Sequence, residues 1–355
     1  MRDWPEGVEE TDLVSALGGG WAVEVRSARY LPVGAGGYHW SVADDGGRAW
    51  FVTVDDLGAE EVSGEAAFGR LGRAYATALA LRRDAGLEFV VAPIPARTGA
   101  TVWRLGPRYA VSVFPMVEGE AGDFGAHRPQ DRDEVARLLV RLHAATPVVA
   151  AGAPRADLAL PGRDRLQDAL DALGREWAGG PFSEPARRLL ASRAGHVERL
   201  LGDFDRLVER VRGTDAGWVV THGEPHPGNL IRSAAGPRLV DWDTVQIAPP
   251  ERDLWMLTGD SGDSGDSGDS GDSGDSGGSG GSGGSGDSGG VLSGYGRATG
   301  RPVDPAGLAL YRVWWELADI TIFVDELRRP HGTGEDITAS WTYLNGYLDG
   351  GNLSP

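Results

Sequence analysis

Cysteine and lysine are both absent from this chain of 355 residues. Without cysteine the protein has no disulfide framework, no thiolate metal site and no thiol nucleophile. Without lysine, all 34 basic residues are arginine, so any step that usually needs an ammonium group falls to another residue. No run approaches about 18 apolar residues, and no basic segment followed by an apolar run opens the chain, so we expect a cytoplasmic protein that does not contact a membrane.

Positive charge is also scarce, because 34 basic residues face 52 acidic ones and the net charge is −18. Seven of the aspartates lie in one low-complexity tract, which leaves a charge of about −11 elsewhere (−18 + 7). This surplus argues against nucleic-acid binding and is compatible with a cationic substrate. An apolar fraction of 41% and 12 tryptophans predict a globular protein with a hydrophobic core.

Residues 259–290 form a tripeptide tract of six GDS units, three GGS units, one more GDS unit and two glycines. The tract has no apolar residue to bury, and Gly/Ser-rich chains behave as flexible coils, so we predict a disordered insertion. Acidic glycine-rich repeats can also bind calcium, but the bulky apolar position of such coils is missing here, which disfavours that alternative.

The chain changes character near residue 118. Residues 21–117 contain short β-like runs separated by glycine, proline and aspartate turns. Within AWFVTV at 49–54 the side chains alternate between two faces, as expected for a strand. One helical segment over roughly 62–84 interrupts these runs. We therefore predict a small, strand-rich N-lobe that carries one helix.

Helical periodicity dominates residues 130–212 and 303–329. Ser183, followed by Glu and Pro, marks a helix start. A short β-rich insert near 218–243 separates the helical blocks. The predicted fold class is α+β, with two lobes. The predicted parts are the N-lobe (1–117), the C-lobe with its β-insert (118–258), the tract (259–290) and the C-terminal helical part of the C-lobe (291–355).

The segment HGEPHPGN at 222–229 is followed by LVDWD at 239–243. Their order resembles the catalytic loop and metal-binding strand of small-molecule kinases, whose phosphoryl transfer needs an acidic residue that holds the attacking hydroxyl and accepts its proton. It also needs an amide on the same loop and a second carboxylate to bind divalent metal at the phosphates. Glu224, Asn229 and Asp241 occur in that order and are the candidate catalytic residues. The alternative is an ordinary polar turn between two strands.

This order of motifs resembles the aminoglycoside phosphotransferase family, whose members have a two-lobed protein-kinase-like fold. The family carries H-G-D-x-x-x-x-N, a hydrophobic strand ending in Asp, and then an Asp-Leu pair, found here in ERDLW at 251–255. The resemblance implies an ATP-dependent kinase that phosphorylates a hydroxyl of a small molecule, such as an aminoglycoside-like or other cationic antibiotic, and so a role in antibiotic resistance. Mg²⁺ would be held by Asn229 and Asp241, because it prefers a few side-chain oxygens plus phosphates and water.

The resemblance extends to the nucleotide site. LPVGAGGYHW at 31–40 lies between two predicted strands, where kinases have a glycine-rich phosphate loop, although ordinary turns can look the same. YAVSVFPMVEG at 109–119 resembles the last N-lobe strand and the hinge that holds adenine. We expect His143 and His222 to brace the fold rather than transfer protons. The implied cofactor-binding residues are Gly34, Gly36, Gly37, Thr53, Phe114 and Met116.

Two positions depart from the family pattern. Glu224 stands where the family has Asp, which moves the carboxyl by about 1.5 Å and can cost about 100-fold in rate unless the site is built around it. Thr53 stands where the family has the lysine that anchors ATP, and a neutral hydroxyl cannot replace that charge. The candidates for a replacement cation are Arg26, Arg29 and Arg48.

These departures leave open an alternative, a catalytically inactive kinase-like protein that binds nucleotide or another ligand. Asn229 and Asp241 favour an active kinase, because an inactive protein has no need of metal ligands.

The acceptor is expected at YRVWWELADITIFVDEL, residues 311–327. There Trp315, Glu316 and Asp319 combine aromatic faces with carboxylates, which suits a cationic group. The simpler alternative is an amphipathic helix that packs its apolar side into the core and exposes its acids to solvent.

Overall fold

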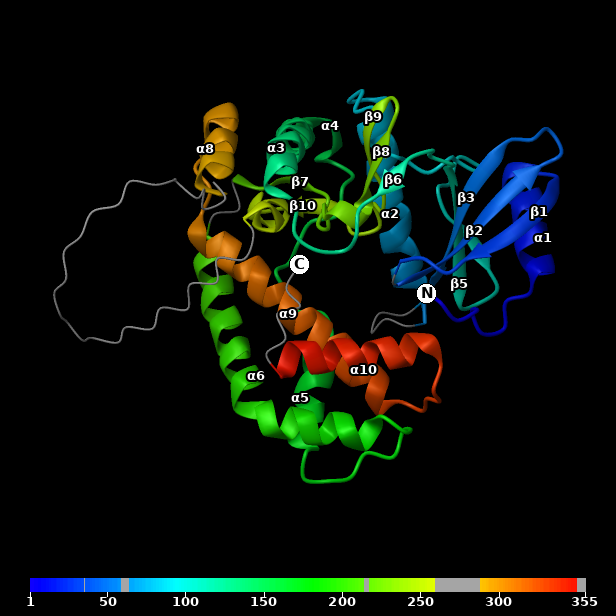
Figure 1. Cartoon of the computed structure of the whole chain (residues 1–355). Helices are drawn as coiled ribbons and strands as arrows, with labels where there is room; N and C mark the ends of the chain where they lie inside the picture. The colour runs from blue at the N-terminus through cyan, green and yellow to red at the C-terminus, as the bar shows by residue number, and fades with distance from the viewer. Residues whose placement is uncertain (35, 59–63, 214–216, 259–287, 350–355) are drawn as a thin grey trace, which may run out of the picture.

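The computed structural model describes residues 1–34, 36–58, 64–213, 217–258 and 288–349. The described chain forms two lobes, a sheet-rich N-lobe and a larger, mainly helical C-lobe with short strands (Figure 1). The predicted α+β, two-lobed architecture is therefore the observed one. Of the predicted disordered tract, residues 259–287 lie outside the described residues, while 288–290 begin a helix.

The N-lobe is built on a five-stranded antiparallel sheet with strand order β1-β2-β3-β5-β4. Because side chains alternate along a strand, Trp50, Val52 and Val54 of β3 are buried on one face, against α1. Thr53 therefore faces the opposite side, toward α2 and the C-lobe. The elements are α1 (Glu10–Trp21), β1 (Val25–Leu31), β2 (Gly37–Asp44), β3 (Ala49–Asp56), α2 (Gly64–Arg83), β4 (Trp103–Leu105) and β5 (Tyr109–Pro115).

The described N-lobe has two helices, so the prediction of one was wrong. The missed helix, α1, contains three consecutive glycines, which lower intrinsic helix propensity and hid it. A capping box between Glu9 and Asp12 begins it, and its apolar side packs on the sheet through Leu13 and Leu17. Trp21, expected in a strand, is its last residue.

The C-lobe helices enclose two small sheets, one formed by β7 and β10 and the other by β6, β8 and β9. The helix α6 begins at Ser183 as predicted and packs along α9 and α10 in a second hydrophobic core. None of the helices described here has the length and apolarity that a membrane span requires. The helices are α3 (Pro129–Ala144), α4 (Thr146–Val149), α5 (Arg163–Asp171), α6 (Ser183–Arg212), α7 (Glu251–Leu254), α8 (Ser288–Thr299), α9 (Pro305–Arg328) and α10 (Glu335–Leu348). The remaining elements are β6 (Glu120–Ala121), β7 (Val219–Thr221), the 3₁₀ turn η2 (Pro227–Asn229), β8 (Leu230–Ser233), β9 (Gly236–Leu239), β10 (Gln246–Ala248) and the 3₁₀ turn η3 (Trp255–Leu257).

Candidate active site

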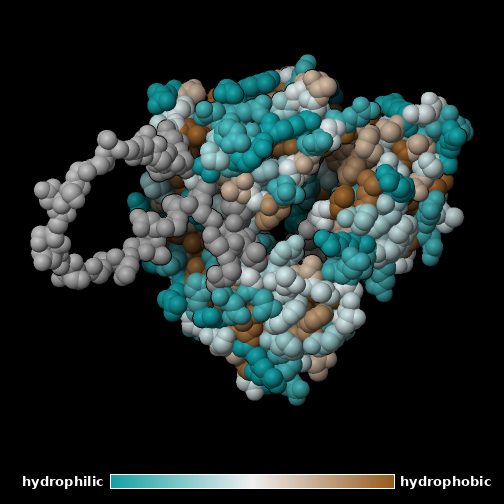
Figure 2. Space-filling view, in the orientation of Figure 1, coloured by the Kyte–Doolittle hydropathy of each residue, from teal (hydrophilic) through white to brown (hydrophobic). Residues whose placement is uncertain are grey.

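The predicted catalytic loop, residues 222–229, joins β7 to β8 on the side of the C-lobe that faces the N-lobe. The molecular surface is hollowed between the two lobes (Figure 2). The loop therefore opens into a cleft between the two lobes.

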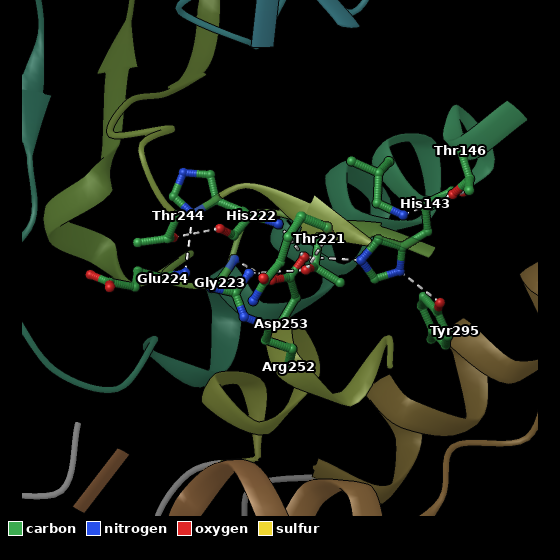
Figure 3. A network of polar contacts seen from close by, with 12 residues as sticks. His143, Thr146, Thr221, His222, Gly223, Glu224, Thr244, Arg252, Asp253 and Tyr295 are labelled. Carbon is green, nitrogen blue, oxygen red and sulfur yellow. Dashed lines mark hydrogen bonds and ion pairs between the residues drawn. The ribbon is translucent and has the colours of Figure 1, made fainter. Parts of the chain in front are cut away.

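Asp253 of α7 fixes the start of this loop from below (Figure 3). Its carboxylate is fully buried and accepts hydrogen bonds from the main-chain nitrogens of His222 (3.0 Å) and Gly223 (2.6 Å). It also bonds Nε2 of His143 at 3.0 Å, while Nδ1 of that ring bonds the Tyr295 hydroxyl at 2.7 Å. Burial acts to raise the pKa of Asp253, but the hydrogen bond and charge of His143, together with the charges of His222 and Arg252, outweigh it, so the pKa lies below its usual value. His143 is therefore a packed bracing residue, as expected.

His222 braces the loop from inside. Nδ1 accepts the main-chain N–H of Glu224 at 3.1 Å, and Nε2 lies 2.8 Å from the carbonyl oxygen of Val240. One acceptor and one donor make a neutral ring protonated on Nε2. Burial agrees, because it lowers the pKa of His222 to about 4. The expected bracing role is thus the observed one.

Arg252, also buried, places a positive charge directly behind the loop. Its guanidinium lies against Gly223 so closely that a Cβ at this residue would overlap it, and Gly223 also has φ +107°, a conformation that favours glycine. Nη1 donates to Oγ1 of Thr221 at 3.0 Å. Burial raises the pKa values of Glu224 and Asp243, and the positive charge of Arg252 offsets part of that rise.

Glu224 points away from this bonded network, toward the open side of the loop (Figure 3). Burial raises its pKa to about 7, and the charge of Asp243 acts in the same direction. Asp319 of α9 also raises this pKa, so α9 lies within electrostatic range of the loop. A carboxyl that titrates near neutral pH suits a general base, because it is substantially ionised yet still accepts a proton readily.

Asp241 follows β9 and adopts φ +64°, in the left-handed region that non-glycine residues seldom occupy. Its carboxyl hydrogen-bonds that of Asp243. Asp241 lies at the exposed edge of the cleft, where partial desolvation and the charges of Asp243 and Glu224 raise its pKa. Two neighbouring carboxyls of this kind suit a divalent cation, which can hold both in their ionised form.

Asn229 connects the loop to this acidic pair. Its side-chain nitrogen donates to the main-chain oxygen of Glu224 at 2.9 Å, which directs the amide oxygen the other way. Its main-chain oxygen accepts from the nitrogen of Val240, next to Asp241, at 3.0 Å. Within the described residues no three His, Asp or Glu side chains form a complete metal cage. Mg²⁺ does not require one, since it takes its other ligands from phosphates and water.

The glycine-rich loop lies between β1 and β2, with Gly34 and Gly36 at φ +69° and +83°. A Cβ on Gly37 would stand 3.1 Å from the ring of His39 and 3.3 Å from the methyl of Thr53, so only glycine fits there without displacement. Thr53 is buried and its hydroxyl lies 3.3 Å from Nδ1 of His39. Because burial lowers the pKa of His39 to about 4, this ring is neutral at pH 7, and the pair contributes no positive charge.

The candidate replacement cations differ in position. Arg48 stacks over Trp50 at 4.0 Å, on the sheet face opposite Thr53, so its proposed role at the phosphates was wrong. Arg26 and Arg29 are exposed on β1. Arg70 of α2, which sequence reasoning missed, lies within electrostatic range of Asp243.

The two hinge residues have separate surroundings. Phe114 is buried at the end of β5, with its ring edge-on to Tyr75 of α2 at 5.3 Å between centroids. Met116 is half-buried and lines a cavity of about 430 Å³, together with Arg82 and Arg238. A contact of either residue with adenine stays a prediction.

Trp315 and Asp319 lie together on the side of α9 that faces the catalytic loop. Phe124, 55% exposed, stacks on Trp315 with centroids 5.9 Å apart, and its ring meets His226 edge-on at 4.9 Å. Asp319 accepts a hydrogen bond from the Tyr347 hydroxyl at 2.6 Å. Burial raises the pKa of Asp319 to about 6. The Phe124–Trp315 ring pair and the Asp319 carboxylate thus lie near Glu224, the predicted general base.

Glu316, the third predicted acceptor residue, lies apart from this group. Its carboxylate is 3.4 Å from Nε2 of His196 on α6. The rest of α9 is an amphipathic helix packed into the core, as the alternative interpretation of this segment had it, because Leu317, Ile320 and Val324 are buried.

Comparison with known proteins decides the family. The chain matches the APH family, described as the phosphotransferase enzyme family, over residues 27–281. It belongs to that family. Protein StrN of Streptomyces griseus is 27% identical over 293 residues, which cover 79% of this chain and 77% of that protein.

Solved structures of the same fold agree with this assignment. Spectinomycin phosphotransferase in complex with ADP and spectinomycin superposes with a TM-score of 0.68 at 14% identity, covering 96% of this chain and 94% of that one. A microcompartment-associated aminopropanol kinase gives 0.58 at 16% identity, covering 96% and 95%. The predicted kinase-like fold is confirmed.

Four residues of this APH-family site were missed by sequence reasoning. Asp243 could have been found, because it lies two residues after Asp241 in the same motif. Arg252 precedes the recognised Asp253 and could also have been suspected. Phe124 and Arg70 come from distant segments, and nothing in the linear sequence connects them with the loop.

Proposed function

We propose that this APH-family phosphotransferase is an ATP- and Mg²⁺-dependent kinase that phosphorylates a hydroxyl group of a small cationic molecule. The observation that carries the proposal is the grouping of Glu224, Asn229, Asp241 and Asp243 at one edge of the cleft. ATP is supported by relatives, since spectinomycin phosphotransferase and amicoumacin kinase have structures with ADP and AMP-PNP respectively.

Each residue has a distinct role in the proposed reaction. Asn229 and Asp241 would hold the metal ion, which would supply positive charge to neutralise the phosphates. Glu224 bonds the acceptor hydroxyl. The hydroxyl oxygen attacks the γ-phosphorus, the bond from that phosphorus to the β–γ bridging oxygen breaks, and the hydroxyl proton passes to Glu224. Arg252 stabilises the ionised form of Glu224 from behind.

The acceptor class follows from the group beside Glu224. Phe124 offers an exposed aromatic ring stacked on the buried Trp315, and Asp319 offers a carboxylate, a combination that binds a positively charged nitrogen. Two relatives of this fold have names that point to amino alcohols, the aminopropanol kinase and a choline kinase of Streptococcus pneumoniae with a TM-score of 0.51. We infer an acceptor that carries both a hydroxyl and a cationic nitrogen, a class that includes aminoglycoside-like antibiotics and so a role in resistance.

A screen of amino alcohols, aminoglycosides and neutral alcohols with γ-labelled ATP tests this proposal. We expect label transfer only to acceptors with a cationic nitrogen, and loss of that preference in Asp319→Asn. Glu316→Gln is the matched control on the same helix, since its carboxylate pairs with α6, and it should retain the preference. Transfer to neutral alcohols at equal rate would contradict the acceptor class.

The second candidate function is an inactive binding protein. The observation that favours it is the buried Thr53 beside a neutral histidine, because the usual ATP-anchoring cation is missing there. Binding of Mg·AMP-PNP without any turnover of Mg·ATP in the screen would support that function instead.

A further inference from the structure

The first three residues of the chain lie between the lobes and contact both. In Figure 1 the N-terminus lies between the N-lobe sheet and the start of α10. The protonated amino group of Met1 donates to the carbonyl oxygens of Val33 (3.3 Å), Gly34 (3.1 Å) and Gly37 (2.8 Å). The hydroxyl of Tyr30 donates to the Met1 carbonyl at 2.8 Å. Met1 thus holds both arms of the glycine-rich loop.

On the C-lobe side the contact is reciprocal. The Asp336 carboxylate accepts from the main-chain nitrogens of Arg2 (2.8 Å) and Asp3 (3.0 Å). In return, the Asp3 carboxylate accepts from the nitrogens of Glu335 (3.4 Å) and Asp336 (3.2 Å), so it satisfies the first free donors of α10. A Cβ on Gly334 would stand 2.5 Å from the Asp3 carboxylate, so glycine at this position permits the approach.

The same helix reaches the proposed acceptor site. Tyr347, near the other end of α10, donates to Asp319. Residues 336 and 347 are eleven positions apart, about 16 Å along a rigid helix. One element therefore connects the glycine-rich loop with the acceptor side of the cleft.

We propose that residues 1–3 form a strap through which α10 positions the glycine-rich loop over the nucleotide, with Asp3 and Asp336 as positioning residues. The effect on nucleotide binding rests on the proposed function, whereas the contacts of residues 1–3 with both lobes do not. Gly34 and Gly36 have positive φ, and glycine loses more conformational freedom on ordering than any other residue. A loop already ordered by the strap binds phosphates with a smaller ordering cost.

Asp336→Ala and Asp3→Ala break the strap from its two sides. Glu335→Ala is the matched control, because it removes the same charge from the same helix turn and leaves the reciprocal main-chain bonds in place. The ion pair with Arg2 that it also removes is exposed and long, at 3.9 Å, so its contribution is small. The readouts are the dissociation constant for Mg·AMP-PNP and hydrogen exchange of the peptide covering residues 31–40. We expect each strap variant to bind at least about fivefold more weakly and to exchange faster in that peptide, with the control within about twofold of the parent.

Two results would overturn the strap. In one, exchange and affinity in both strap variants match the Glu335→Ala control. In the other, exchange rises but affinity does not change, so that the contact exists without positioning the loop. If the parent itself binds no Mg·AMP-PNP, the nucleotide-binding part of the proposed function fails, and exchange alone then decides whether residues 1–3 order the loop.

Discussion

Replacement of Asp253 by Asn should detach the catalytic loop from the C-lobe core. The buried carboxylate accepts hydrogen bonds from two main-chain nitrogens of the loop and bonds the ring of His143. Asn keeps one of the two oxygens, but its NH₂ group then faces a donor that has lost its acceptor. A hydrogen bond to a charged group contributes about 1.5–3 kcal/mol, and breaking a buried charged pair costs about 3–5 kcal/mol. We expect the free energy of unfolding to fall by about 3–5 kcal/mol and the melting temperature by on the order of 10 °C.

The assay is guanidinium and thermal unfolding of the variant beside Glu251→Gln. Glu251 is buried on the same short helix and accepts one bond from the nitrogen of Asp304 at 2.7 Å, which Gln can still accept, so this control should lose far less. The pH dependence gives a second check. Because the pKa of Asp253 is lowered, its stabilisation is present above its unfolded pKa of about 4 and is lost as pH falls through the folded value. A loss below about 1 kcal/mol at neutral pH, with unchanged nucleotide binding, would refute the bracing role.

Three further predictions concern the reaction itself. Asp241→Ala should reduce kcat more than Glu224→Gln, because the metal neutralises the phosphates whereas the hydroxyl proton can leave late in a loose transition state. A larger loss of steady-state kcat in Glu224→Gln would contradict these roles. Thr53→Lys should give no gain in kcat or ATP affinity, because a longer chain overpacks a buried site at about 1–3 kcal/mol, and a tenfold gain would mean that the parent merely lacks its anchor. Because the pKa of Glu224 is raised to about 7 and the ionised form accepts the proton, kcat/KM for the acceptor should fall as pH drops through about 7, whereas a flat profile would argue against Glu224 as the base.

Much of the fold could be predicted because its signals are local. The alternation along residues 49–54 predicted β3, and Ser183 marked the first residue of α6. The helix α1 could not be predicted in the same way. Its run of glycines opposes helix formation locally, and the helix is stabilised by packing Leu13 and Leu17 on a sheet formed by later residues.

The site shows the same division between local and tertiary information. The spacing within residues 222–229 and 239–243 predicted the loop and the grouping of Glu224, Asn229 and Asp241, because these residues belong to short local motifs; their roles as base and metal ligands stay predictions. The more distant surroundings could not be predicted, since Phe124 and Arg70 come near the site only through the tertiary fold. Arg48 was a candidate because it lies near the glycine-rich loop in the sequence. In the fold it stacks on Trp50, on the sheet face opposite Thr53.

Transfer of labelled γ-phosphate from Mg·ATP to an amino alcohol acceptor, measured for the parent and for Asp241→Ala, tests the central claim most directly. The account predicts one ADP formed per phosphorylated hydroxyl in the parent. In the variant transfer should disappear, while melting stays close to that of the parent because Asp241 lies at the exposed edge of the cleft. Tight binding of Mg·AMP-PNP by a parent that transfers no phosphate to any acceptor, or equal transfer by both proteins, would contradict it.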